Sequence, residues 1–136
     1  MLRAALILLA LAALLPALAT GCNPPAPVRF APGTSGAEIK GGVPRGMPDC
    51  LTITARAGQV MEASITSTEG NAVFQLHPPG WRLNRDPYGG VDVSNRTLTT
   101  EDAMRARITL PADGTYLIVI GTTRGGADYT LRVSIR

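Results

Sequence analysis

The two cysteines of this 136-residue chain, Cys22 and Cys50, are the side chains whose chemistry depends most on the cellular compartment. In an oxidising compartment they can form a disulfide, and an even cysteine count favours that outcome. The alternative comes from Ala19-Thr20-Gly21-Cys22, which resembles a bacterial lipobox although Leu18 stands one place before its usual position. In that case Cys22 would carry a lipid and Cys50 would remain a free thiol. The residues leave both outcomes open.

The sequence contains no set of residues with the composition of a catalytic or metal-binding centre. His77 is its only histidine, and its serines and cysteines lack a context that would activate a nucleophile. The carboxylates are scattered, and two cysteines with one histidine lack the spacing of a metal site. We therefore expect no enzymatic activity, no metal and no cofactor.

Three side chains are candidates for binding rather than catalysis. Arg124 stands in a glycine-rich stretch, residues 121–128, where its guanidinium could form a bidentate pair with a carboxylate. The alternative is an arginine that is simply solvated at a turn. Trp81 and Tyr88 lie in a Pro- and Gly-rich segment, residues 78–90. Aromatic side chains there could anchor a protein interface or stack on sugar rings, whereas a buried Trp81 would close one end of a β-sandwich.

The start of the chain has the pattern of an export signal. Arg3 precedes an uncharged apolar stretch, residues 4–18, which is too short for a typical membrane-spanning helix and ends in small residues. Cleavage before Thr20 fits the small-x-small pattern of Ala17-Leu18-Ala19. We predict a cleaved signal peptide at 1–21, a proline-rich tether at 22–27 and a folded domain at 28–136.

The net charge of the mature chain is small. Removal of residues 1–21, which contain Arg3, leaves 12 of the 13 basic residues against 10 acidic ones, a net charge of +2. Neither sign forms a run, which argues against a nucleic-acid-binding surface or a polybasic membrane surface. Contact with a membrane would come only through a lipid on Cys22.

Apolar residues alternate with polar ones along most of the mature chain, as is typical of β-strands. Gly and Pro turns such as Gly41-Gly42 and Asp113-Gly114 separate the alternating segments. Only residues 100–106 have the signals of a helical turn. The sequence predicts an all-β domain, a small antiparallel β-sandwich or jelly roll of about eight strands. The clearest alternating segments are 51–55, 61–65, 72–76, 106–110, 116–120 and 129–135.

An ordered series of short phrases runs along the domain. The phrases are Phe30-Ala31-Pro32-Gly33-Thr34-Ser35-Gly36, Ala57-Gly58-Gln59, Phe74-Gln75-Leu76-His77-Pro78-Pro79-Gly80, Leu110-Pro111-Ala112-Asp113-Gly114-Thr115-Tyr116 and Ala127-Asp128-Tyr129-Thr130-Leu131-Arg132-Val133. This series resembles the periplasmic lysozyme inhibitors of Gram-negative bacteria, those of the g-type and i-type enzymes, across residues 28–136. More loosely, it is similar to bacterial pre-peptidase C-terminal domains.

The resemblance implies a β-sandwich in the periplasm of a Gram-negative bacterium that blocks the active-site cleft of a lysozyme by loop insertion. The inserted loop of the inhibitors has a Ser-Gly-x-Tyr pattern, which Asp113, Gly114, Thr115 and Tyr116 match with Asp113 in place of the hydroxyl residue. Tyr116 also begins the apolar face of a strand and could equally be a core residue. A longer, arginine-containing loop of the inhibitors corresponds to the turn with Arg124.

Two other functions are compatible with the same residues. A peptidoglycan-binding accessory module would use Trp81 and Tyr88 as a stacking platform, and a structural envelope lipoprotein would need only a lipid on Cys22. The leading hypothesis is a non-enzymatic inhibitor whose partner is a g-type or i-type lysozyme. Its expected contacts are the residues from Asp113 to Tyr116 together with Arg124.

Overall fold

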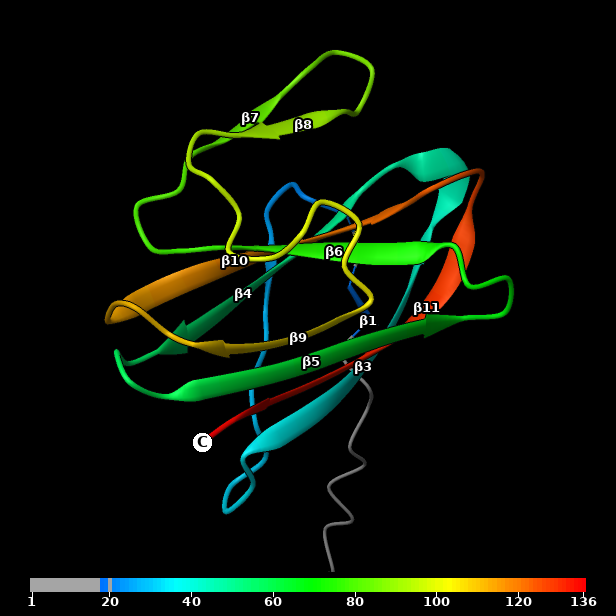
Figure 1. The fold of residues 1–136 in the computed structure, drawn as a ribbon. Coiled ribbons are helices and arrows are strands. Elements are labelled where there is room, and N and C mark those ends of the chain that lie inside the picture. Colours follow the sequence, from blue (N-terminus) through cyan, green and yellow to red (C-terminus); the bar gives the residue numbers. More distant parts are fainter. Residues whose placement is uncertain (1–17, 20) are drawn as a thin grey trace, which may run out of the picture.

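The computed structural model describes residues 18, 19 and 21–136. The predicted signal peptide therefore falls almost wholly outside the described residues, as does Thr20 of the predicted cleavage site. Within the described part, no helix is long and apolar enough to cross a membrane. The described chain is a β-sandwich with a small hairpin lying over one of its faces (Figure 1).

Two sheets form the layers of the sandwich. One has the strand order β1-β3-β11-β5-β9 and the other β2-β4-β10-β6, while β7 and β8 pair with each other. The short strands β1 and β2 pair in parallel with β3 and β4, and the longer strands pair in antiparallel fashion. The bounds are β1 Leu18–Ala19, β2 Ala26–Pro27, β3 Gly36–Val43, β4 Asp49–Ala55, β5 Val60–Ser67, β6 Ala72–His77, β7 Leu83–Arg85, β8 Val91–Val93, β9 Arg105–Thr109, β10 Gly114–Thr122 and β11 Ala127–Ile135, with a short 3-10 helix, η1, at Pro44–Gly46.

The all-β sandwich predicted from the alternating segments is confirmed. The structure has more strands than predicted, because β1, β2 and β7 have only two or three residues each and give almost no alternation to detect. The helical turn expected at residues 100–106 is wrong. Ala103 forms a bridge with Phe74, and β9 begins at Arg105, so the backbone there pairs with neighbouring strands instead.

Strand β11 shows how the alternation builds the core between the sheets. Tyr129, Leu131, Val133 and Ile135 are buried, whereas Arg132 between them is exposed. Successive side chains of a strand point to opposite faces, so the apolar set leaves water together. Each such side chain contributes roughly 1.5–3 kcal/mol, and a slip of one residue in register would turn the whole set outward.

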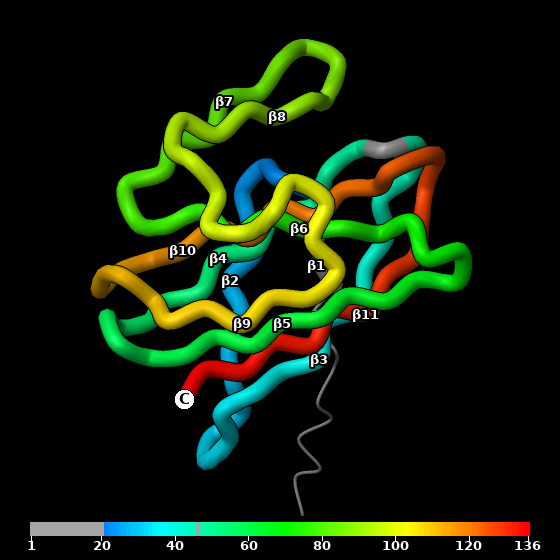
Figure 2. The backbone as a smooth tube through the Cα atoms, in the orientation of Figure 1, coloured from blue at the N-terminus to red at the C-terminus, as the bar shows by residue number. Residues whose placement is uncertain are grey.

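Strand β10 is buried on both of its faces. Tyr116, Ile118 and Ile120 face the core between the sheets, and Leu117, which points the other way, is fully buried as well. The reason is the β7–β8 hairpin, which we call the flap and which lies over this sheet (Figure 2). Apolar side chains of both flap strands pack against the buried cluster of Leu117, Cys22 and Cys50. The flap therefore creates a second, smaller hydrophobic cluster outside the sandwich.

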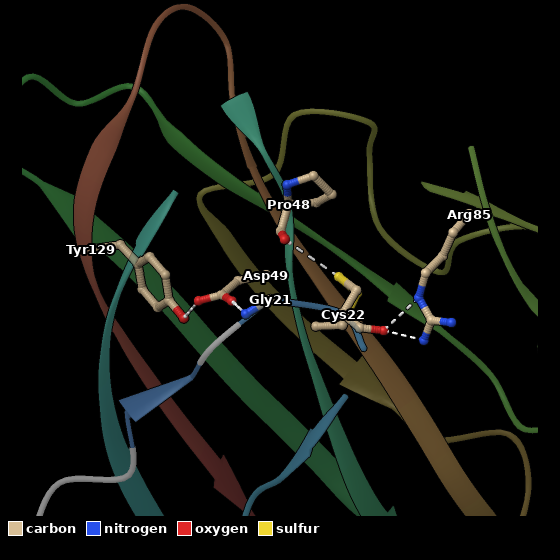
Figure 3. The surroundings of a disulfide bond; sticks show 7 residues. Gly21, Cys22, Pro48, Asp49, Arg85 and Tyr129 are labelled. Carbon is tan, nitrogen blue, oxygen red and sulfur yellow. Dashed lines mark hydrogen bonds between the residues drawn. A yellow bond between two sulfur atoms is a disulfide. The ribbon is translucent and has the colours of Figure 1, made fainter. Parts of the chain in front are cut away.

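A disulfide between Cys22 and Cys50 forms the centre of this second cluster (Figure 3). On the flap, Arg85 donates a hydrogen bond of 2.9 Å from its Nε to the carbonyl oxygen of Cys22. Of the two outcomes for Cys22, the structure has the disulfide, and a sulfur bonded to another sulfur cannot carry a lipid. The segment predicted to be a tether, residues 22–27, lies against the sandwich, because the disulfide holds its first residue and β2, at its end, pairs with β4.

The disulfide joins residues that are 28 positions apart in the sequence. Reducing it should lower the free energy of unfolding by about 3 kcal/mol, chiefly because the unfolded chain gains conformational entropy. Urea unfolding with and without a reductant measures this difference. The double variant Cys22→Ser, Cys50→Ser is the control and should not respond to the reductant. Equal unfolding midpoints of the wild type in both conditions would contradict the prediction.

Candidate functional site

Three sequence phrases that lie far apart in the chain meet at one end of the sandwich, on the left in Figure 1. They belong to residues 56–59, 78–82 and 110–115, and we call their meeting place the Trp81 end. The first turn pairs with the third segment through a hydrogen bond of 2.9 Å from the amide of Gly58 to the carbonyl oxygen of Leu110. Three of the phrases singled out in the sequence therefore contact one another at the same end of the sandwich.

Asp113 and Gly114 fix the turn that leads into β10. The Oδ1 of Asp113 accepts a hydrogen bond of 2.8 Å from the amide of Ala57. Gly114 has a φ of 138°, which side chains disfavour, and a Cβ there would come within 2.9 Å of the Cβ of Pro79. The Asp-Gly pair thus has a structural reason to stand here, and one carboxylate oxygen of Asp113 is already engaged.

Tyr116 lies directly behind this turn, and its side chain is fully buried. Its hydroxyl donates to the carbonyl oxygen of Ala112 at 2.7 Å and accepts from the amide of the same residue at 3.1 Å. In immunoglobulin sandwiches a tyrosine stabilises a corner by a similar bond to the backbone a few residues upstream. Tyr116 therefore positions the turn from inside, and the exposed side chains of Asp113 and Thr115 are what a partner can reach.

Trp81 and Tyr88 lie at the two ends of β7 and have different surroundings. The indole Nε1 of Trp81 donates a hydrogen bond of 3.0 Å to the carbonyl oxygen of Thr115, and the ring packs against the cluster around the disulfide. Tyr88 stands in the turn of the flap and is 93% exposed. Because a strand rises about 3.3 Å per residue, one sugar ring cannot stack on both aromatic side chains.

Arg124 lies at the other end of the sandwich, in the turn between β10 and β11. Its exposed guanidinium makes one hydrogen bond of 3.3 Å, from Nη2 to the carbonyl oxygen of Glu69. The turn is held by Asn71, which is 1% exposed and whose Nδ2 donates to the carbonyl oxygens of Arg124 and Gly126, both at 2.9 Å. Asn71 was not predicted as a site residue. Its signal in the sequence is the turn dipeptide Gly70-Asn71, which does not show what the side chain will hold.

The predicted contact residues therefore form two sites rather than one. Asp113 to Tyr116 lie at the start of β10, and Arg124 follows its end. Since β10 has 9 residues, the two turns are separated by roughly 30 Å along the strand. A single turn that enters a cleft can use one of these sites but not both.

A broad hollow on the described surface contains none of the predicted residues. It has a volume of about 1430 Å³ and covers the outer face of β3, β11, β5 and β9. Its walls carry the ion pairs Arg107–Glu62 and Arg132–Glu38, whose side chains are all at least 45% exposed. Exposed ion pairs of this kind contribute at most about 1 kcal/mol each. The hollow is an open, solvated sheet face.

His77 has a structural environment. It is 4% exposed, and its ring nitrogens lie 3.0 Å from the carbonyl oxygen of Asn95 and 3.2 Å from Oε1 of Gln75. Burial lowers the pKa of His77 below its ordinary value, although the contact with Asn95 partly opposes the shift. Within the described residues, no group of three or more His, Cys, Asp or Glu side chains could hold a metal ion.

Comparison with known proteins shows what the chain resembles. The periplasmic inhibitor of g-type lysozyme from Aeromonas hydrophila, PliG, is 26% identical over 88% of this chain and 100% of its own, with a TM-score of 0.67. The chain is structurally similar to periplasmic inhibitors of g-type lysozyme. Neither protein-family models nor curated protein sequences give a match.

Two further structures share the fold of these inhibitors. PliG of Salmonella Typhimurium is 22% identical over 82% of this chain and 96% of its own, with a TM-score of 0.59. The pre-peptidase C-terminal domain of a collagenase from Bacillus anthracis is 16% identical over 83% of this chain and 97% of its own, with a TM-score of 0.50. The resemblance to PliG-like inhibitors and to pre-peptidase C-terminal domains, predicted from the sequence phrases, is confirmed.

The lowered pKa of His77 predicts that the folded protein becomes less stable at acidic pH. Folding lowers this pKa, so the unfolded chain binds the proton more tightly, and protonation favours unfolding. The contribution of neutral His77 to the free energy of unfolding is fully present above the unfolded pKa of 6.5. It is lost as the pH falls below that value. Between about pH 7.5 and 5.5, we expect the thermal midpoint of the wild type to fall more steeply than that of His77→Gln. Parallel curves for the two proteins would contradict this.

Proposed function

We propose that this chain is a periplasmic inhibitor that binds a lysozyme and blocks its active-site cleft. The observation that carries the proposal is the similarity to the g-type lysozyme inhibitor of Aeromonas hydrophila, which extends over the whole of that protein. The disulfide fits a location outside the cytoplasm, where such bonds persist. A non-enzymatic role also agrees with the structural environment of His77.

The turn that contains Arg124 is the contact that we favour. Its guanidinium is exposed and forms no ion pair with a carboxylate among the described residues. Glycosidases act through carboxyl groups in the sugar-binding cleft, and an arginine can make two parallel hydrogen bonds to a carboxylate. Because Asn71 already fixes the backbone of the turn, little of the binding free energy is spent on ordering it.

The turn at the Trp81 end is the alternative contact. There Tyr116 is buried, and the exposed side chains are Asp113, whose Oδ1 is bonded to Ala57, and Thr115, whose hydroxyl is bonded to that of Thr54. Hydrogen bonds hold this turn as well, but it presents a carboxylate and a hydroxyl in place of a cation. Since the two turns lie at opposite ends of the sandwich, substitutions can separate them.

The purified mature protein should slow the lysis of bacterial cell walls by a g-type lysozyme in a concentration-dependent way. We expect the strongest effect on this class because the similar inhibitors act on g-type lysozyme. Assays with i-type and c-type lysozymes under the same conditions measure specificity. Undiminished lysis by all three classes at micromolar protein would reject the proposal.

Arg124→Ala should weaken inhibition of the g-type enzyme by about tenfold or more, because it removes the cation that pairs with a cleft carboxylate. Arg132→Ala is the matched control, since Arg132 is also exposed but lies on the outer face of the five-stranded sheet. It should inhibit like the wild type. Thr115→Arg tests the other end. If it abolishes inhibition while Arg124→Ala has no effect, the contact lies at the Trp81 end and the assignment to Arg124 is wrong.

A further inference from the structure

The outer face of the four-stranded sheet is only partly covered by the flap. Cys50 and Leu117 lie beneath it, but farther along the sheet Val73 of β6 and Val119 of β10 line a groove of about 360 Å³. We call this the flap groove, because the flap residue Val91 forms another part of its lining. The groove contains none of the residues predicted from the sequence to bind a partner.

The two parts of the flap groove differ in chemistry. Its lining is apolar at Val73, Val119 and Val91 and polar at Gln75 and Thr122, whereas the segment between β8 and β9 contributes Glu101 and Asp102. Both acidic residues are exposed, and neither forms an ion pair with a described residue. An apolar channel next to two carboxylates is complementary to a long side chain with an alkyl stem and a cationic head group.

The segment that carries these carboxylates is held in place by β6. The amide of Phe74 donates a hydrogen bond of 2.8 Å to the carbonyl oxygen of Ala103, and Nε2 of Gln75 donates one of 3.3 Å to the carbonyl oxygen of Glu101. The backbone on either side of Asp102 is therefore paired with the sheet. Because the backbone that carries the carboxylates is already positioned, ligand binding would need to order only the two acidic side chains.

Two exposed apolar side chains stand beside the flap groove. Met47 is 49% exposed and Tyr88 is 93% exposed. Their loops touch, since a Cβ on Gly89 would come within 2.5 Å of Cε of Met47. Within the flap turn, Oδ1 of Asp86 accepts hydrogen bonds from the amides of Tyr88 at 2.8 Å and Gly90 at 2.9 Å. Tyrosine and methionine are enriched in protein interfaces, and Gly90 itself lines the groove.

We propose that the flap groove binds a lysine or arginine side chain of a protein partner, with Tyr88 and Met47 packing beside it. The inference rests on the proposed function, under which the partner is a lysozyme. Many lysozymes are basic, and a mature chain with a net charge of +2 has no long-range attraction to them. Recognition therefore depends on local complementarity, which the acidic groove supplies. Gly121 and Thr122 also line the groove and lead into the turn with Arg124, so groove and turn can contact one partner.

Titration calorimetry with a g-type lysozyme, at low and at physiological salt, tests the groove. The double variant Glu101→Gln, Asp102→Asn should bind about tenfold more weakly than the wild type at low salt and depend less on salt. The matched control, Glu38→Gln with Glu62→Gln, removes two carboxylates from the opposite face of the sandwich and changes the net charge equally. It should bind like the wild type. Equal weakening by both variants, or by neither, would overturn the inference.

The same experiment separates the groove from the proposed function. If the wild type inhibits lysozyme and neither double variant loses affinity, the groove is not a contact and the inhibitor function stands. If the wild type neither binds nor inhibits a lysozyme, the function fails, and the groove is then tested with a hexalysine peptide by NMR. Amide shifts at Val73, Val91 and Val119 that vanish in Glu101→Gln, Asp102→Asn would support a cation-binding groove, and their absence in the wild type would overturn it.

Discussion

A buried, hydrogen-bonded carboxylate joins the two sheets and also binds Gly21, the last residue of the predicted signal peptide. Asp49 of β4 is 1% exposed, and its Oδ2 accepts a hydrogen bond of 2.7 Å from the hydroxyl of Tyr129 in β11 of the other sheet. Its Oδ1 accepts one from the amide of Gly21 (Figure 3). Burial, and then the bond to the carboxylate, raise the pKa of Tyr129 far above its ordinary value, so its hydroxyl stays a donor. Without such partners a buried carboxylate would strongly destabilise the fold. Gly41 leaves space for the Tyr129 side chain, since a Cβ at residue 41 would come within 2.5 Å of the tyrosine oxygen.

The flap depends on the residue that follows this carboxylate. Cys50 is bonded to Cys22, whose carbonyl oxygen accepts the hydrogen bond from Arg85 of the flap. The flap has only two three-residue strands, too few to be stable alone, so its position over Leu117 relies on these contacts. The flap groove and the exposed Tyr88 exist only while the flap is held there. A bond that forms outside the cytoplasm thus shapes the surface at which we expect a partner to bind.

Local patterns in the sequence were enough to predict the sandwich, because the long strands each bury one face and so alternate in polarity. They were not enough where a face is covered from outside. The burial of Leu117 depends on where the short flap hairpin packs, and local alternation does not show this. The placement of Asp113 and Arg124 at opposite ends could have been deduced, since β10 lies between them. The flap groove could not, because Val73 and Glu101 are brought together by pairing between distant segments.

The phrases by which the sequence resembles known families describe architecture more than activity. Asp113 bonds to Ala57, and Gly114 makes room for Pro79, and these contacts would serve a sandwich of this design whatever it binds. The same architecture occurs in a collagenase domain as well as in lysozyme inhibitors, and a shared fold does not by itself imply a shared function. What distinguishes one such sandwich from another must therefore lie outside the phrases. In this chain that leaves the turn with Arg124 and the flap groove, which present a cation and carboxylates without ion-pair partners on backbone that the sandwich holds by hydrogen bonds.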